Sequence, residues 1–248
     1  MIKNFITALQ FLTIFTVSKK HNVEEGDLAK SMVYFPFVGF LIGILLVYSD
    51  KALSYVLPHT IANAFILLIS VIATRALHID GLADTLDGVM GGMDRESRLR
   101  IMKDSRLGTA GALGIIFLLL VKYLSLNNLF LDAKTSALLL APTLGRWSQT
   151  LMVFRASYGR EQGMGRAFVG HLRAGGLVVA SVVTVGLAAF VSEIWAVPLI
   201  AGTVMLTLSC RWYFVRKLGG VTGDAIGAVS ELNEALSLLL FVVFASGG

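Results

Sequence analysis

The sequence is poor in cysteine, in proline and in charge. Of its 248 residues, one is cysteine (Cys210), four are proline and 15% are charged. A lone cysteine excludes a disulfide scaffold and a thiolate metal site. Soluble domains carry about 25% charged residues, so the low share excludes a disordered chain and a water-soluble globular one. The four histidines lie far apart without an H-x-x-x-H pair, which argues against zinc: His21, His59, His78 and His171.

Apolar residues, by contrast, make up 56% of the chain, and the mean hydropathy is +0.77. A helix needs about 20 mostly apolar residues to cross a bilayer. Seven stretches qualify, at residues 33–53, 60–78, 108–126, 136–154, 175–191, 194–214 and 225–245. Residues 4–17 are too few and predict an interfacial or re-entrant helix. The expected fold is all-α, a polytopic membrane helix bundle with about seven transmembrane helices in one domain, residues 1–248.

Basic residues are distributed unevenly between the loops that join these stretches. Fifteen lie in four alternate loops and two in the opposite loops. The fifteen are Lys19, Lys20, Lys30, Arg95, Arg98, Arg100, Lys103, Arg106, Arg155, Arg160, Arg166, Arg173, Arg211, Arg216 and Lys217, and the two are Lys51 and Lys134. By the positive-inside rule, the four loops face the cytoplasm from the inner membrane. Topology therefore explains the net charge of +5, and the expected partner is a lipid bilayer rather than nucleic acid.

Six of the sixteen acids fall between residues 80 and 104, at the predicted cytoplasmic face. On a helix, Asp80, Asp84 and Asp87 project within about 60° of one another. Three carboxylates on one face repel each other, so the arrangement implies a compensating cation. An all-oxygen site predicts Mg²⁺ as the cofactor, with Mn²⁺ second. The alternative is a solvated acidic helix in a cytoplasmic loop.

A second acidic window contains Asp224, Glu231 and Glu234. Their spacing places them within an arc of about 80° on a helix, which makes Asp224 a further candidate metal ligand. Glu231 and Glu234 fall inside an apolar stretch, and carboxylates at membrane depth usually mark function. Thr222 or Asp224 also suits the N-cap of this helix, a role that is compatible with metal binding.

Two further residues have competing interpretations. Arg146 lies in the middle of a predicted span and needs a polar partner, either a phosphate, one of the acids, or a structural ion pair. His78 either binds substrate or ends a helix.

Several runs match a known family. Residues 78–88 read H-I-D-G-L-A-D-T-L-D-G, and residues 100–109 read R-I-M-K-D-S-R-L-G-T. Together with A-L-Q-F-L-T at 8–13, G-R-W at 145–147 and the window 220–234, they resemble the cobalamin synthase family, the adenosylcobinamide-GDP ribazoletransferases. The resemblance covers nearly the whole chain in order. Residues 155–165 depart from the family pattern at Gly159 and Gln162, which affects detailed substrate contacts rather than the reaction class.

The resemblance implies a Mg²⁺-dependent integral membrane transferase. It joins adenosylcobinamide-GDP to α-ribazole, or to α-ribazole 5′-phosphate, and releases GMP. The implied metal ligands are Asp80, Asp84, Asp87 and Asp224, with Glu231 able to complete the shell. The implied substrate contacts are His78, Lys103, Arg106, Arg146 and Thr222, of which Lys103, Arg106 and Arg146 are the candidates for pyrophosphate. The base is Asp104, Glu231 or Glu234, because partial desolvation raises the pKa of a carboxyl group.

Two rival functions remain at this stage, and the oligomeric state is open, with a homo-oligomer as one option. A CDP-alcohol phosphotransferase would share D-x-x-D-G at residues 84–88, but Val89 and Met90 replace its A-R and the distal D-x-x-x-D is missing. An ion-coupled transporter also places acids within spans. The gathering of acids at one predicted face argues against transport.

Overall fold

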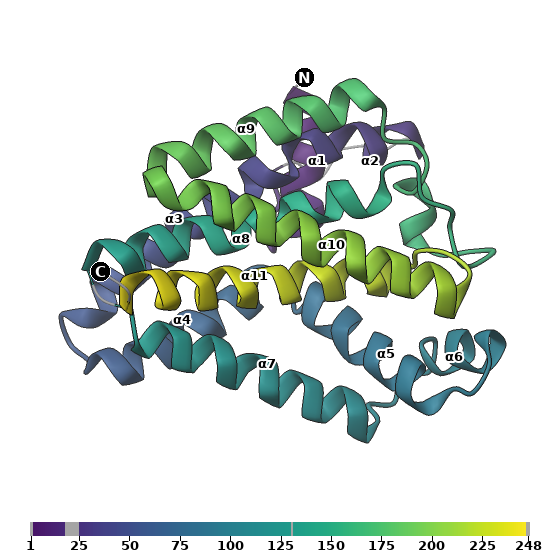
Figure 1. Ribbon diagram of the computed structural model, residues 1–248, viewed down its shortest axis with the longest axis horizontal. Coiled ribbons are helices and arrows are strands. Elements are labelled where there is room, and N and C mark those ends of the chain that lie inside the picture. The colour runs from purple at the N-terminus through teal and green to yellow at the C-terminus, as the bar shows by residue number, and fades with distance from the viewer. Residues whose placement is uncertain (1, 18–24, 130, 247–248) are drawn as a thin grey trace.

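The computed structural model describes residues 2–17, 25–129 and 131–246, which form helices joined by loops (Figure 1). The helices are α1 (Ile2–Leu12), α2 (Glu25–Ser31), α3 (Phe35–Ser54), α4 (His59–Ala73), α5 (Leu77–Gly91), α6 (Arg95–Ile101), α7 (Thr109–Asn127), α8 (Leu131–Val153), α9 (Ala174–Ser192), α10 (Ala196–Leu218) and α11 (Gly223–Ser246). Short 3-10 helices are η1 (Met32–Tyr34), η2 (Met164–Ala167) and η3 (Glu193–Trp195). Between described residues, one isolated bridge joins Tyr158 to Val221. The expected all-α class is confirmed.

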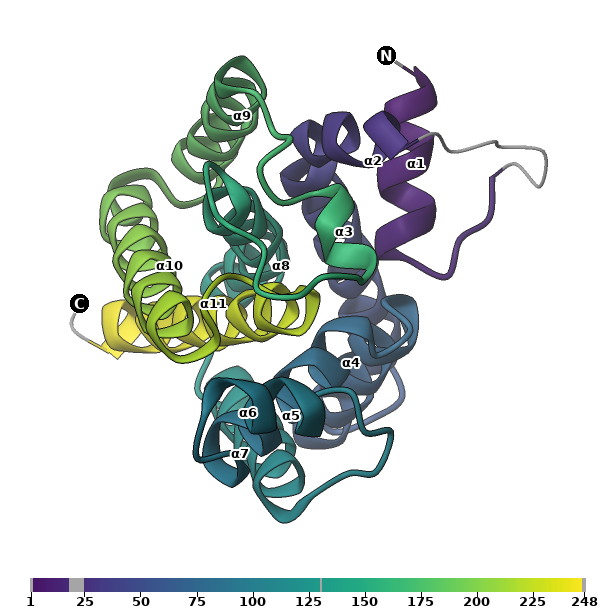
Figure 2. The ribbon, with the colours of Figure 1, turned by 90° about the vertical axis from the view of Figure 1, so that its right-hand side faces the viewer.

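Each of the seven predicted apolar stretches overlaps most of one helix: α3, α4, α7, α8, α9, α10 and α11 in order. Within the described residues, four helical segments are long and apolar enough to cross a membrane: Gly26–Ser54, Thr109–Asn127, Ala174–Leu218 and Gly223–Ala245. The third contains both α9 and α10, which lie side by side (Figures 1 and 2). The bent pair of α4 and α5 adds a fifth if it is one span. The chain is therefore a multi-pass membrane protein, and the count of seven spans stays a prediction.

The outward surfaces of α7, α9 and α10 are apolar. Exposed large side chains on these helices are Leu113, Ile116, Phe117, Leu120, Leu124, Val178, Val179, Val182, Val185, Phe190, Val197, Met205, Leu208, Trp212 and Val215. A soluble monomer rarely exposes contiguous apolar surface on this scale. Lipid is the solvent that suits these faces.

Helix α8 lies inside the bundle, between α3 and α11. Glycines allow it to pack closely against α3, because a Cβ at Gly39 would lie 2.4 Å from the carbonyl oxygen of Pro142. At Gly43, one turn later, a Cβ would lie 2.7 Å from the Cα of Leu139. Small residues four apart are the usual means by which membrane helices approach each other.

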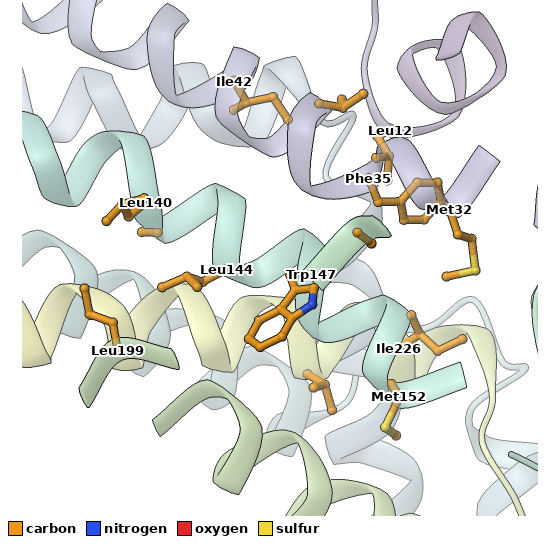
Figure 3. Packing of buried hydrophobic residues seen from close by; sticks show 14 of the residues in the cluster. Leu12, Met32, Phe35, Ile42, Leu140, Leu144, Trp147, Met152, Leu199 and Ile226 are labelled. Carbon is orange, nitrogen blue, oxygen red and sulfur yellow. The ribbon is translucent and has the colours of Figure 1, made fainter. Parts of the chain in front are cut away.

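The core around α8 is filled by aliphatic side chains from several helices. Figure 3 shows Leu140 and Leu144 of α8 between Ile42 of α3 and Leu199 of α10. All four are buried. Trp147 adds a polar link, since its indole N–H donates to the hydroxyl of Ser181 on α9 at 3.0 Å.

The predicted stretch 60–78 is broken at its end. Helices α4 and α5 meet at 88°, and the corner residues Arg75 and Ala76 both have left-handed backbone, with φ of 54° and 55°. The guanidinium of Arg75 donates to the carbonyl oxygens of Gln10 and Thr13 at 2.5 and 2.6 Å. The corner therefore holds the C-terminal end of α1, the short N-terminal helix that the sequence predicts.

The basic loops gather at one end of the bundle, on the right in Figure 1. Arg95 of α6 donates to the carbonyl oxygens of Leu218 and Gly159 at 3.0 and 3.2 Å, and Arg211 donates to that of Phe154 at 2.8 Å. Three of the four basic loops are thus hydrogen-bonded together. In the remaining loop, Lys30 lies on α2, whereas Lys19 and Lys20 lie outside the described residues. That this end faces the cytoplasm stays a prediction.

Candidate active site

A cavity of about 390 Å³ opens at the end of the bundle that carries the basic loops. Its walls come from α1, η1, the start of α3, α5, α8, the start of α11 and the loop between α8 and α9, which crosses in front of α8 in Figure 2. Its polar lining is His78, Asp80, Gln149, Tyr158, Arg160 and Asp224, and its apolar lining includes Phe11, Met32, Phe35 and Phe168. The cavity thus has a charged side and an aromatic side.

Close packing of α5 against α11 forms the charged side. A Cβ at Gly81 would lie 2.8 Å from the carbonyl oxygen of Asp224, so only glycine allows this approach. It brings Asp80 and Asp84, on α5, beside the first turn of α11. The carboxylates of Asp80 and Asp224 are near enough to repel that of Asp84. Acids that are 140 residues apart in the sequence therefore form one cluster.

Asp87 has a different role from its neighbours on α5. Its two carboxylate oxygens accept hydrogen bonds from the backbone N–H groups of Gly108 and Gly111, at 2.7 and 2.8 Å. These donors lie at the start of α7, where helix N–H groups have no partner within the helix and where the dipole favours negative charge. Asp87 therefore fastens α5 to α7, and it does not line the cavity.

A loop fixed by backbone hydrogen bonds contributes Arg160. The N–H of Gly159 donates to the carbonyl of Val221 at 3.0 Å, and the N–H of Val221 donates to that of Ser157 at 2.8 Å. Arg160 follows directly, and its guanidinium lies 2.6 Å from the carboxylate of Asp224. Burial raises the pKa of the neighbouring Tyr158, so its hydroxyl remains a hydrogen-bond donor at neutral pH.

The acidic cluster is not a complete metal cage. Across the described ranges, no three side chains of His, Cys, Asp or Glu come close enough to hold an ion. Mg²⁺, however, commonly binds one or two carboxylates and completes its shell with water and substrate phosphate oxygens. The carboxylates of Asp80, Asp84 and Asp224, beside an open cavity, fit that mode. The predicted cation therefore remains compatible with the site and stays a prediction.

The predicted acids and arginine of the membrane interior form a separate cluster. Lys122 of α7 donates to Glu231 and Glu234 at 2.6 Å each. Arg146 of α8 donates to Glu234 and, at 3.1 Å, to the hydroxyl of Ser230. We name these five residues the interior ionic cluster; all are buried, and none lines the cavity.

These contacts favour the structural interpretation of Arg146, because its partner is a carboxylate. Gly145 makes the contact possible, since a Cβ there would lie 2.8 Å from the side chain of Glu234. Glu231 and Glu234, the candidate bases, are occupied with Lys122 and Arg146. The proposed pyrophosphate and base roles of these residues stay predictions without support from their position.

The remaining candidates lie at different places. Lys103 and Arg106 are exposed, and Arg106 holds Asp104 in an ion pair at 2.6 Å that lowers the pKa of Asp104 to about 2. Thr222 is buried and caps α11, because its hydroxyl accepts the N–H of Ala225 at 3.2 Å. His78 does line the cavity, beside Asp80.

Three polar residues of the cavity are not among the sequence candidates: Tyr158, Arg160 and Gln149. Arg160 falls in a glycine-rich loop, Tyr158-Gly159-Arg160, whose contact with α11 has no signal in local periodicity. Gln149 is the one amide side chain in the predicted stretch 136–154, which is the one signal that points to it. In each case the sequence shows an unusual residue but not what it faces.

Comparisons with known proteins show the family to which the chain belongs. The family model described as cobalamin-5-phosphate synthase matches residues 4–242. A protein of Geotalea daltonii is 38% identical over 242 residues, covering 98% of each chain, and one of Syntrophobacter fumaroxidans is 39% identical over 245 residues, covering 96% of this chain and 97% of its own. A protein of Alkaliphilus metalliredigens is 35% identical and covers 100% of this chain and 98% of its own.

All three relatives are named adenosylcobinamide-GDP ribazoletransferase. No solved structure matches the chain. The match extends over the helices that line the cavity, from α1 to α11, and over the interior ionic cluster. The chain, an enzyme with a helical membrane fold, therefore belongs to the cobalamin-5-phosphate synthase family.

Proposed function

We propose that this enzyme transfers the adenosylcobinamide phosphoryl group from adenosylcobinamide-GDP to α-ribazole or to α-ribazole 5′-phosphate. A ribazole hydroxyl forms the new bond to phosphorus, the pyrophosphate P–O bond breaks, and GMP leaves. The products are adenosylcobalamin, or its 5′-phosphate, and GMP. The relatives' shared name supports the donor substrate.

One observation carries the proposal: the charged side and the aromatic side meet in one cavity. Asp80, Asp224 and Arg160 offer groups for a metal and for phosphate oxygens, whereas Phe11 and Phe168 offer a surface for apolar rings. A nucleotide-linked donor needs the charged side for its phosphates, and a heteroaromatic acceptor needs the aromatic side for its ring. The cavity also opens where the basic loops gather, which suits an anionic substrate arriving from the cytoplasm.

Mg²⁺ is the cofactor that we propose, held by Asp80, Asp84 and Asp224. When bound, it supplies charge stabilisation for the pyrophosphate oxygens. Arg160, whose guanidinium lies 2.6 Å from Asp224, binds the same oxygens beside the ion, and the exposed Lys103 and Arg106 attract the anion. Asp87 orients α5 rather than binding the ion.

The proton of the ribazole hydroxyl needs an acceptor within reach of the cavity. Glu231 and Glu234 are closed in the interior ionic cluster, and Asp104 is paired with Arg106. Asp224 is likewise paired, with Arg160. Asp80 also lines the cavity, so we assign the acceptor to Asp80, through the carboxylate oxygen that does not hold the ion. Its position also suits an active site that faces the cytoplasm from the inner membrane.

The test is GMP release and cobalamin formation by the purified protein in liposomes. The reaction contains adenosylcobinamide-GDP and α-ribazole, with and without Mg²⁺, for the wild type and for Asp84→Asn. We expect Mg²⁺-dependent product from the wild type and a loss of about 10²-fold or more in the variant. The exposed Asp132→Asn, at the opposite end of the bundle, is the matched control and should retain activity.

Two outcomes would contradict the proposal. Folded wild-type protein that forms no product would exclude the ribazole transfer and direct the search to CDP-alcohol substrates, then to ion flux. Full activity without Mg²⁺ would exclude the metal while leaving the transfer itself intact.

A further inference from the structure

Gln149 is a buried amide that the fold leaves without a partner. Its side chain is 2% exposed, it lines the cavity, and its Nε2 has no hydrogen bond to any described residue. His78, across the cavity on α5, is 3% exposed, and its Nδ1 likewise has no partner in the described part of the chain. A buried polar group without a hydrogen bond costs free energy, so such a group in a native cavity points to a ligand.

The neighbours of Gln149 on α8 make the contrast clear. Thr143, Ser148 and Thr150 are equally buried, and each hydroxyl donates to a carbonyl of its own helix at 2.6 to 2.7 Å. These buried hydroxyls of α8 are therefore satisfied within their own helix. Gln149, by contrast, lines the cavity, and its Nε2 has no hydrogen-bond partner among the described residues.

The wall beside Gln149 is a cluster of three aromatic rings. The centroids of Phe11 and Phe168 are 4.9 Å apart, those of Phe35 and Phe168 are 5.9 Å apart, and Phe11 stacks on Phe35 at 6.1 Å. Met32 lies next to Phe35 on the same wall (Figure 3). Ring faces with a thioether and one neutral donor suit a planar, uncharged heteroaromatic ring with a single acceptor nitrogen.

We propose that this part of the cavity binds the benzimidazole base of the α-ribazole acceptor, with the Gln149 amide donating to its free ring nitrogen. The proposal rests on the ribazole transfer proposed above and adds the residue that recognises the acceptor. With the base against the phenylalanines, the attached ribose extends toward Asp80 and Asp224, where its hydroxyl would react. His78 borders the path between the two sides.

The other rings of the substrates fit this wall less well. Guanine presents two acceptors and an amino donor on its edges, and a single amide would leave some of them unpaired. The corrinoid is several times larger than a bicyclic base and carries many amides, whereas this wall is aromatic. The base of the acceptor has one acceptor nitrogen and two methyl groups, which match one donor and an apolar surface.

The test compares α-ribazole with its indole analogue, in which C–H replaces the acceptor nitrogen. Binding of each compound to the protein in nanodiscs is measured by fluorescence titration, for the wild type and for Gln149→Leu. We expect the wild type to bind α-ribazole about tenfold more tightly than the analogue, and the variant to bind the two equally. An unchanged preference in Gln149→Leu would overturn the proposal.

Kinetics and a matched control separate recognition from folding. Gln149→Leu should raise the KM for α-ribazole about tenfold and leave the KM for adenosylcobinamide-GDP unchanged. Asn233→Leu is the control, because Asn233 is also a buried amide, but one that donates to Val229 and Thr207 at 2.8 and 3.2 Å. It should lower the thermal midpoint and keep the preference for α-ribazole.

The experiment distinguishes this inference from the proposed function. If the wild type forms no cobalamin, the proposed function fails. If it forms cobalamin but Gln149→Leu raises the KM for adenosylcobinamide-GDP instead, the proposed function is supported and this inference is wrong. The aromatic wall then binds the donor substrate. A variant that loses both its thermal midpoint and its activity would be replaced by Gln149→Met, whose equal volume keeps the packing.

Discussion

Helix α11 contributes residues to two charged regions, which differ in net charge and in whether they lie beside the cavity. At its first turn, Asp224 faces Asp80 and Asp84 beside an open cavity, with Arg160 in contact. Two turns later, the interior ionic cluster sets two carboxylates against two cations, closed off from the cavity. The first region has an excess of negative charge and the second is balanced.

The two regions show two roles for acidic residues in a membrane protein, one structural and one in ligand binding. A buried carboxylate is tolerated when a cation neutralises it, and its removal then leaves that cation unpaired. A cluster with unbalanced charge next to a cavity is suited to binding ions and phosphate from outside. We therefore expect substitutions in the interior ionic cluster to change stability and those at the cavity to change activity.

The largest expected effect is on stability, from Glu234→Ala. It leaves Lys122 and Arg146 buried with one carboxylate between them, and the loss of a buried partner costs about 3–5 kcal/mol. The free energy of unfolding in mild detergent, measured by chemical denaturation, checks the value. Replacing Lys122 and Glu231 together by Met and Leu should cost less than the sum of the single changes; additive losses would contradict the cluster.

Asp224→Asn tests the other side of the comparison. The carboxylate lines the cavity and carries the charge assigned to metal and phosphate, so we expect about 10²-fold less activity with little change in thermal midpoint. Product formation at saturating Mg²⁺ measures the loss. A large fall in thermal midpoint with activity retained would show that this acid serves the fold instead.

Thr222→Ala sharpens the boundary between the regions. The hydroxyl caps α11 two residues before Asp224, and loss of an N-cap costs about 1 kcal/mol. Denaturant unfolding should detect this change, while the KM of both substrates stays constant. A raised KM without a loss of stability would restore Thr222 to the substrate contacts that the sequence predicts.

The smallest effect is expected at the exposed pair outside both regions. Arg106 lowers the pKa of Asp104 to about 2, so the pair stabilises the folded state above the ordinary aspartate pKa, and this contribution is lost as the pH falls toward 2. In Arg106→Gln the pKa of Asp104 should return to near its usual value. Carbon NMR of labelled aspartate follows it, and an unchanged pKa would exclude the pair as the cause.

Much of the fold could be predicted because lipid leaves the backbone few options. Residues 108–126 were expected as a helix, and α7 spans Thr109–Asn127. Hydropathy identifies such apolar runs directly. Each run must be helical, because a segment in a bilayer has to satisfy its own backbone hydrogen bonds. The bend at Arg75 and Ala76 was not expected, because it depends on left-handed residues that are held by a distant helix.

The site could be predicted only as a set of residue types. Periodicity placed Asp80, Asp84 and Asp87 on one helix face but could not show that the N-terminus of α7 occupies Asp87. Likewise the acids at 231 and 234 have a partner, Lys122, more than 100 residues away in the sequence. Which carboxylates are free to bind a ligand is decided by tertiary packing, so sequence alone leaves the question open.

The hydrogen bonds from Arg75 to the end of α1 have a practical consequence for handling this protein. Phe11, on that helix, forms part of the cavity wall, and Ile14 is bonded to Ala73 at the same corner at 2.9 Å. A bulky fusion at the amino end would disturb α1, and through it both the corner at Arg75 and the cavity wall at Phe11. An affinity tag for purification therefore belongs at the carboxyl end, because α11 ends on the left in Figure 1, away from the basic loops on the right.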